Sequence, residues 1–325
     1  MREPLAPVSL DEIVAAQNRI AEHVIRTPLI PLDVASAPAS IYLKLESLQP
    51  IGSFKLRGAA NAMTLVDPDE LAGGVWTASA GNWAQGMAWH AQRMNIPCQI
   101  VVPDYAPKTK LRAIREFGAE IIQVPFAQWW EAIRTGTFDG LSSYFIHPVS
   151  DPRVIAGNGT IGLEIIEDLP GVSAIVVPFG GGGLSCGIAC AVRGMERQWS
   201  IPVHAAEVET AAPFAASLAQ DRPATIEHTP SFVDGIGGRS VLPEMWPLAK
   251  EVLAGSLVVT IDQVAQTIRL LIEHAHVIAE GAGAASVAAA LAGQAGTSEE
   301  KIVCVVSGGN IDHSTLASIL QGQTP

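Results

Sequence analysis

The chain has 325 residues, of which 48% are apolar, and a formal net charge of −12. A negative balance argues against general nucleic-acid binding, which needs clustered lysine and arginine. No apolar run reaches the length of a membrane span, and the N-terminal residues lack the basic start of a secretory signal. The four cysteines form no CxxC pair, so we interpret them as buried thiols in a reducing, cytoplasmic setting.

Strand-like and helix-like segments alternate from the N-terminus onward. Ser9 and Glu12 form a capping box, which predicts the start of the first helix. Further along, apolar runs typical of strands are each followed by a segment with helical spacing, in units that span residues 41–66, 73–94, 98–118, 119–136 and 171–195. Strand-then-helix repeats favour a parallel sheet with helices on both faces, so we expect an α/β fold.

The C-terminal part continues with two predicted strands, at residues 202–209 and 301–306, and an amphipathic helix at residues 262–278. Apolar residues at helical spacing in that helix are predicted to be buried: Val264, Ile268, Leu271, Ile272 and Ala275. No Gly/Ser-rich linker and no solenoid repeat divides the chain. Any second domain is therefore expected to be folded into the chain rather than attached after it.

Three predicted strands end in turns of small residues, and ligands of open parallel sheets bind at such strand ends. Residues 79–82, Ser-Ala-Gly-Asn, open a helix whose free N–H groups suit a carboxylate, or they form a simple tight turn capped by asparagine. Residues 180–184 place four glycines before a helix, which suits a phosphate ester or a hinge. The spacing matches neither GxGxxG nor a Walker loop. The third turn, at residues 307–310, presents the hydroxyl of Ser307.

One of the six lysines differs from the others in its sequence surroundings. Lys55 opens a predicted helix among small residues, in the stretch SFKLRGAANAM. Such surroundings can lower the pKa of a lysine, as a Schiff-base nucleophile requires, although a lysine that extends to solvent from a packed helix is the alternative. The others lie in polar, exposed-looking or alternating segments: Lys44, Lys108, Lys110, Lys250 and Lys301.

A lysine of this kind, a phosphate cradle and a carboxylate cradle together describe a pyridoxal phosphate enzyme. The sequence resembles the threonine/serine dehydratases, members of the fold type II pyridoxal-phosphate enzymes that also include tryptophan synthase β and serine racemase. The motifs that carry the resemblance occur in family order between residues 26 and 310: RTPL, SFKLRGA, SAGNWAQG, IAGNGTIGLEI, GGGGL, FVDGIG and VSGGN.

The resemblance implies that Lys55 carries pyridoxal 5′-phosphate as an internal aldimine and that Asn82 contacts the ring hydroxyl. Ser307 would face the pyridine nitrogen as a neutral group, which suits β-elimination better than transamination. The remaining residues implied at the cofactor hold the phosphate or line the ring: Phe54, Gly180, Gly181, Gly182, Gly183, Leu184 and Gly235.

The resemblance also implies a reaction. A β-hydroxy amino acid of the L-threonine/L-serine class would displace Lys55, whose freed amine removes the Cα proton, and the products would be a 2-oxo acid and ammonia. The substrate carboxylate is expected at Ser79, Ala80, Gly81 and Asn82.

Two domains are expected, each an open, mostly parallel sheet flanked by helices, with the cofactor in the cleft between them. Residues 1–74 and 148–325 would form the larger, cofactor-binding domain, and residues 75–147 a smaller mobile domain that carries the substrate turn. The resemblance suggests a homodimer that takes a small-molecule amino acid, with no nucleic-acid or membrane partner.

Several positions depart from the family pattern. Trp83 replaces a common histidine, and five tryptophans lie within residues 76–130. These tryptophans belong to the core or line a pocket for a bulkier substrate such as L-threo-3-phenylserine; 3-hydroxyaspartate is a further candidate. Ala80 stands where serine racemases carry a serine base, which disfavours a racemase. Pro213 takes the second acidic position of a divalent-cation site that would begin at Glu207, so no metal is expected.

Three other functions remain as alternatives. A cysteine-synthase-like β-replacement enzyme shares the fold, but SFKLRGA and SGGN are of the serine/threonine type. A non-catalytic homologue would not need Lys55. An NAD-dependent oxidoreductase is disfavoured because GxGxxG is missing.

Overall fold

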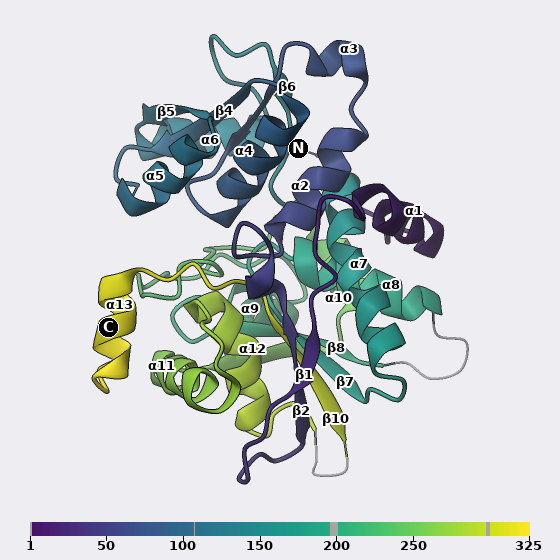
Figure 1. The fold of residues 1–325 in the computed structure, drawn as a ribbon, viewed down its shortest axis with the longest axis vertical. Coiled ribbons are helices and arrows are strands. Elements are labelled where there is room, and N and C mark those ends of the chain that lie inside the picture. Colours follow the sequence, from purple (N-terminus) through teal and green to yellow (C-terminus); the bar gives the residue numbers. More distant parts are fainter. Residues whose placement is uncertain (1, 107, 196–200, 297–299) are drawn as a thin grey trace.

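The computed structural model describes residues 2–106, 108–195, 201–296 and 300–325, whose strands form two separate sheets (Figure 1). The larger sheet has the order β1-β2-β10-β7-β8-β9, and the smaller one the order β5-β4-β3-β6. Neighbouring strands run parallel except for β1 and β2. The expected α/β class, with two open and mostly parallel sheets flanked by helices, is confirmed.

The larger sheet takes its strands from both ends of the chain. They are β1 (Leu29–Pro31), β2 (Ser40–Leu45), β7 (Ala174–Pro178), β8 (Val203–Val208), β9 (Gly255–Val259) and β10 (Lys301–Val306). Alternate residues of every strand except β9 enter two apolar clusters, one on each face, and β9 enters only one of them. The helices that cover the faces are α1 (Leu10–Ile20), α7 (Pro152–Asp168), α8 (Gly183–Met195) and α10 (Trp246–Val252) on one side, and α11 (Ile261–Leu270) and α12 (Gly281–Leu291) on the other.

The smaller sheet consists of β3 (Val75–Ala78), β4 (Cys98–Pro103), β5 (Glu120–Val124) and β6 (Tyr144–Phe145). Helices α4 (Asn82–Met94) and α5 (Lys108–Glu116) cover one face, and α6 (Phe126–Thr135) covers the other. Helices α2 (Lys55–Thr64) and α3 (Pro68–Leu71) add Met63 and Leu71 to the cluster under α4, and Val66 joins it from the connection between the two helices. Helix α2 therefore bridges the two sheets, and the domain boundary at residue 74 stays a prediction.

The remaining elements are η1 (Glu46–Leu48), α9 (Pro213–Gln220), the π-helical turn η2 (Leu271–Ala275) and α13 (His313–Leu320). In the predicted helix 262–278, Val264, Ile268 and Leu271 are fully buried, but Ile272 and Ala275 are only half-buried. The reason is that η2 widens the helix after Leu270, and the chain leaves it at His276 with a φ of 57°.

Other sequence predictions can be checked directly. The capping box of Ser9 and Glu12 is present at the start of α1, and all four cysteines are buried and free, as predicted. In the part of the chain that the structure describes, no helix is long and apolar enough to cross a membrane.

Candidate active site

The turn after β10 is joined to the segment that precedes α2. The N–H of Phe54 donates to the carbonyl of Ser307 at 3.0 Å, and the side-chain amide of Asn310 donates to the carbonyl of Ile51 at 2.9 Å. These contacts link residues more than 200 positions apart. They place Lys55, the first residue of α2, beside Ser307, as the sequence predicted for one site.

Lys55 is half-buried, and its Nζ lies 4.7 Å from the centroid of the Phe54 ring. Among the described residues, Nζ makes no hydrogen bond or ion pair. Loss of hydration lowers the pKa of Lys55 to about 8, although the negative charge of Glu280 acts in the opposite direction. A neutral amine is therefore accessible near physiological pH, as a nucleophile or a base requires.

The glycine turn between β7 and α8 leaves no room for side chains at several of its positions. Gly182 has a φ of 93°, and a Cβ on Gly181 would lie 2.6 Å from a methyl group of Val149. A Cβ on Gly180 would lie 3.2 Å from the carbonyl of Gly235, so these two predicted residues are neighbours. Because the first turn of α8 has N–H groups without intrahelical partners, the turn suits a phosphate. Leu184 behind it belongs to the same apolar cluster as Phe54.

The predicted substrate turn, Ser79 to Gly81, follows β3 and opens α4. The N–H of Ser79 donates to the carbonyl of Val101 at 3.1 Å, and the N–H of Gly81 donates to Oγ of Ser79 at 3.3 Å. Further along α4, a Cβ on Gly86 would lie 3.3 Å from the carbonyl oxygen of Lys55, so α4 and α2 approach closely. The turn, including the half-buried Ala80, therefore opens a helix that packs against the start of α2.

Glu280 is a site residue that the sequence reasoning missed. Both of its carboxylate oxygens accept from Nδ2 of Asn82, at 2.8 and 3.1 Å, and Nδ2 of Asn310 donates to Oδ1 of Asn82 at 2.8 Å. Glu280 is only 8% exposed and stands immediately before α12. The sequence did offer one indication, a single carboxylate directly before a run of small residues. Such a run has no helical periodicity, so the helix itself was not predicted.

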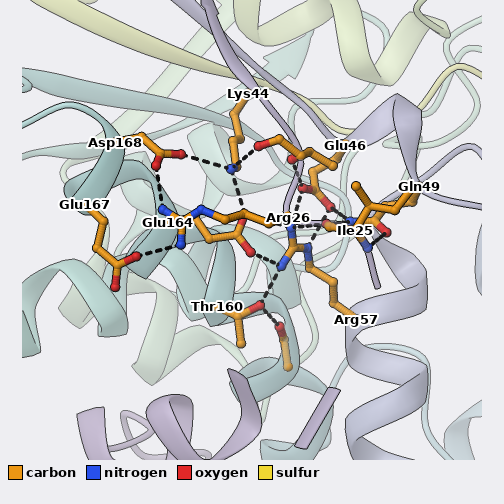
Figure 2. A network of polar contacts seen from close by, with 12 residues as sticks. Ile25, Arg26, Lys44, Glu46, Gln49, Arg57, Thr160, Glu164, Glu167 and Asp168 are labelled. Atoms are coloured by element: carbon orange, nitrogen blue, oxygen red, sulfur yellow. Dashed lines mark hydrogen bonds and ion pairs between the residues drawn. The ribbon is translucent and has the colours of Figure 1, made fainter. Parts of the chain in front are cut away.

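Behind Lys55, a buried network of four charged side chains holds α2 in place (Figure 2). Arg57 donates to both oxygens of Glu46 at 2.8 Å and to Glu164 on α7 at 2.7 Å. Lys44 on β2 pairs with Glu164 at 2.6 Å and donates to the carbonyl of Thr27 at 2.6 Å. The four charged residues are at most 3% exposed. Lys44 lies in a strand, as the sequence predicted, but α7 covers that side of β2 and buries its side chain, which the sequence pattern did not indicate.

The tryptophans near the substrate turn are mostly packing residues. Trp83 is 2% exposed, belongs to the apolar cluster under α4, and donates from Nε1 to Oγ1 of Thr77 at 2.8 Å. Trp76 is equally buried on the opposite face of the smaller sheet, whereas Trp130 is exposed. The interpretation of Trp83 as part of a substrate pocket therefore lacks support, and its interpretation as core fits the contacts.

Glu207, the residue considered for a cation site, has its oxygens engaged within the protein. It accepts from the N–H groups of Phe214 and Ala215, both at 2.8 Å, and from Oγ of Ser256 at 2.6 Å. Glu207 thus caps the start of α9. Within the described residues no group of three or more His, Cys, Asp or Glu could hold a metal ion. The lack of a cation at Glu207 stays a prediction.

The arrangement fits pyridoxal phosphate, because an amine of lowered pKa, a side-chain-free turn at a helix start and a neutral serine meet at one site. A family model described as pyridoxal-phosphate dependent enzyme matches residues 20–308. The chain belongs to this family. The predicted cofactor is therefore confirmed.

Individual relatives agree with this assignment. The chain is 40% identical over 318 residues to the L-threonine ammonia-lyase of Thermotoga maritima, covering 96% of this chain and 78% of the relative. It is 34% identical over 323 residues to the catabolic L-threonine dehydratase TdcB of Escherichia coli, covering 96% of each. The solved structure of maize serine racemase superposes with a TM-score of 0.87 at 31% identity, covering 98% of each chain. The resemblance to the fold type II dehydratases is confirmed.

Proposed function

We propose that the chain is an ammonia-lyase that converts a β-hydroxy amino acid of the L-threonine/L-serine class to a 2-oxo acid and ammonia. The observation that carries the proposal is Lys55, a lysine of lowered pKa without an ion pair, beside Ser307. Relatives that cover nearly all of this chain are named threonine ammonia-lyase or dehydratase, which supports the same chemistry.

Lys55 is proposed to bind the cofactor and then to move the substrate proton. When bound, pyridoxal phosphate supplies an electrophilic carbonyl for the amino group and a conjugated ring that accepts electrons from Cα. The residues of the chain move the proton and contact the ring. The Lys55 amine, with a pKa of about 8, is suited to accept the Cα proton near neutral pH. Ser307 offers a neutral hydroxyl to the ring nitrogen, so the ring nitrogen is not held protonated.

Backbone groups are proposed to bind the anionic ends of both ligands. The N–H groups of Gly180 to Leu184, at the start of α8, would hold the cofactor phosphate. The turn of Ser79, Ala80 and Gly81 would bind the substrate carboxylate at the start of α4, with Asn82 next to it. Phe54 and Gly235 would line the cofactor.

The substrate side chain is proposed to be small. Trp83 lies in the core, so no described tryptophan contact favours the phenyl ring of phenylserine over the methyl group of threonine. Ala80 carries no hydroxyl, so it supplies no second base for racemisation. The homodimer and the cytoplasmic setting stay predictions.

The test is the release of 2-oxo acid from purified holoenzyme given L-threonine, L-serine, L-threo-3-phenylserine or L-threo-3-hydroxyaspartate. We expect threonine or serine to react fastest, and Lys55→Ala to lose at least about 10³-fold in rate. Chiral analysis of residual serine should show no D-serine. Fastest turnover of phenylserine, or formation of D-serine without 2-oxo acid, would contradict the proposal.

A further inference from the structure

Glu280 occupies the residue before α12 but does not cap that helix. At this position a short polar side chain commonly accepts from the first helical N–H groups. The side chain of Glu280 makes no such bond, and its carboxylate instead contacts Asn82, 198 residues away on α4. The backbone of Glu280 serves local structure: its N–H donates to the carbonyl of Gly308 at 3.0 Å, and its carbonyl accepts from the N–H of Ala284 at 3.0 Å.

Gly308 makes room for this carboxylate, and Gly235 lies in ordinary contact distance of it. A Cβ on Gly308 would lie 2.5 Å from Oε1 of Glu280, and a Cβ on Gly235 would lie 3.6 Å from the same atom. Any side chain at position 308 would displace the carboxylate. Part of the SGGN motif is therefore small because Glu280 must fit against it.

The contacts of Asn82 fix which end of its amide faces the site. Oδ1 accepts from Asn310, and Nδ2 donates to Glu280. A carboxylate can only accept, so it cannot pair with Oδ1, and a flipped amide would lose both bonds. One hydrogen on Nδ2 serves the carboxylate, and the second remains for a ligand.

We propose that Glu280 is a positioning residue for the cofactor: with Asn310 it holds the amide of Asn82 so that an N–H, and not the carbonyl oxygen, meets the ring hydroxyl of pyridoxal phosphate. The inference rests on the proposed function, since it assumes that Asn82 contacts this hydroxyl. Glu280 thereby couples α12, which packs on the larger sheet, to the start of α4 on the smaller sheet.

The test is equilibrium binding of two ligands to the full-length apoenzyme, followed by absorbance. One ligand is pyridoxal phosphate, and the other is its 3-deoxy analogue, which keeps the aldehyde and the phosphate but lacks the ring hydroxyl. Glu280→Gln should weaken binding of pyridoxal phosphate roughly 10- to 100-fold. A glutamine amide lacks the charge and can donate as well as accept, so it no longer excludes the flipped amide of Asn82. The variant should change binding of the analogue by less than about 2-fold, because the analogue has no ring hydroxyl for Asn82 to contact. Any effect of the substitution on Lys55 acts on both ligands and cancels in the ratio of the two dissociation constants.

Further variants separate positioning from a general structural role. In an Asn82→Ala background, Glu280→Gln should add no further loss for pyridoxal phosphate. Asn310→Ala removes the hydrogen bond to Oδ1 of Asn82, so it should also weaken binding of pyridoxal phosphate more than binding of the analogue. This variant replaces Glu280→Gln if the latter does not fold. The control is Glu273→Gln, an exposed position near α12 in sequence, which should bind both ligands as wild type does.

The outcomes distinguish the two proposals. Equal weakening for both ligands, or full additivity with Asn82→Ala, would overturn the role of Glu280 and leave the proposed function intact. A wild-type apoenzyme that does not bind pyridoxal phosphate at Lys55 would overturn both.

Discussion

Lys44 and Lys55 are eleven positions apart, one fully buried and the other half-buried, and their electrostatic surroundings differ. Lys44 is fully buried and pairs with Glu164 in a network whose charges are matched by Arg57 and Glu46 (Figure 2). Nζ of Lys55 has no ion pair in the described structure, and its pKa is lowered to about 8. Burial alone therefore does not mark a reactive lysine. The decisive feature is burial without an ion pair.

The largest expected effect concerns the network. Lys44→Met removes one partner of a buried ion pair and leaves carboxylate charge less compensated, so it should lower the free energy of unfolding by about 3–5 kcal/mol. Urea unfolding of the apoenzyme would measure this. Lys250→Met is the matched control, because Lys250 pairs with Asp221 on the surface, and its loss should cost less than about 1 kcal/mol. Equal losses for both variants would contradict the account.

Lys55→Met should change stability in the opposite direction. The pKa of Lys55 is about 8 in the folded protein and 10.5 in the unfolded chain, so the charged amine destabilises the folded state below pH 8. This destabilisation disappears as the pH rises from about 8 to above the pKa of the unfolded chain. Removing the amine should therefore stabilise the apoenzyme at pH 7, on the order of 2 kcal/mol. Urea unfolding at pH 7 and at pH 10.5 would measure it. A gain that is the same at both pH values would show that packing, and not charge, is responsible.

The smallest expected effect concerns Trp83. Trp83→Phe removes the hydrogen bond to Thr77 but keeps most of the ring in the core, so it should cost about 1 kcal/mol. The ratio of threonine to phenylserine turnover should stay within about 2-fold of wild type. A large shift toward phenylserine would show that Trp83 does contact the substrate side chain.

Local sequence patterns predicted the parts of the fold that short-range chemistry determines. The Ser9–Glu12 capping box and the strand 98–103 were found where they were expected. The three-residue β1 was not predicted, because so short an antiparallel edge strand has no measurable period. Helix α12 was not predicted either, because it consists almost entirely of small residues and has no polar face.

The site was predictable to the extent that it follows motifs. Lys55, Asn82, the glycine turn and Ser307 all belong to recognisable segments, and the structure brings those segments together. Glu280 and the burial of Lys44 were missed for a common reason. The contact of Glu280 with Asn82 and the burial of Lys44 under α7 both depend on segments that are distant in the sequence. The residues next to Glu280 or Lys44 in the sequence do not indicate such contacts.

The most direct experiment identifies the lysine that binds the cofactor. Holoenzyme would be reduced with borohydride, digested and mapped by mass spectrometry. The account predicts one pyridoxyl group per chain, on Lys55, and none on Lys44. Modification of Lys44 or of an exposed lysine in place of Lys55, or an unmodified chain, would contradict it.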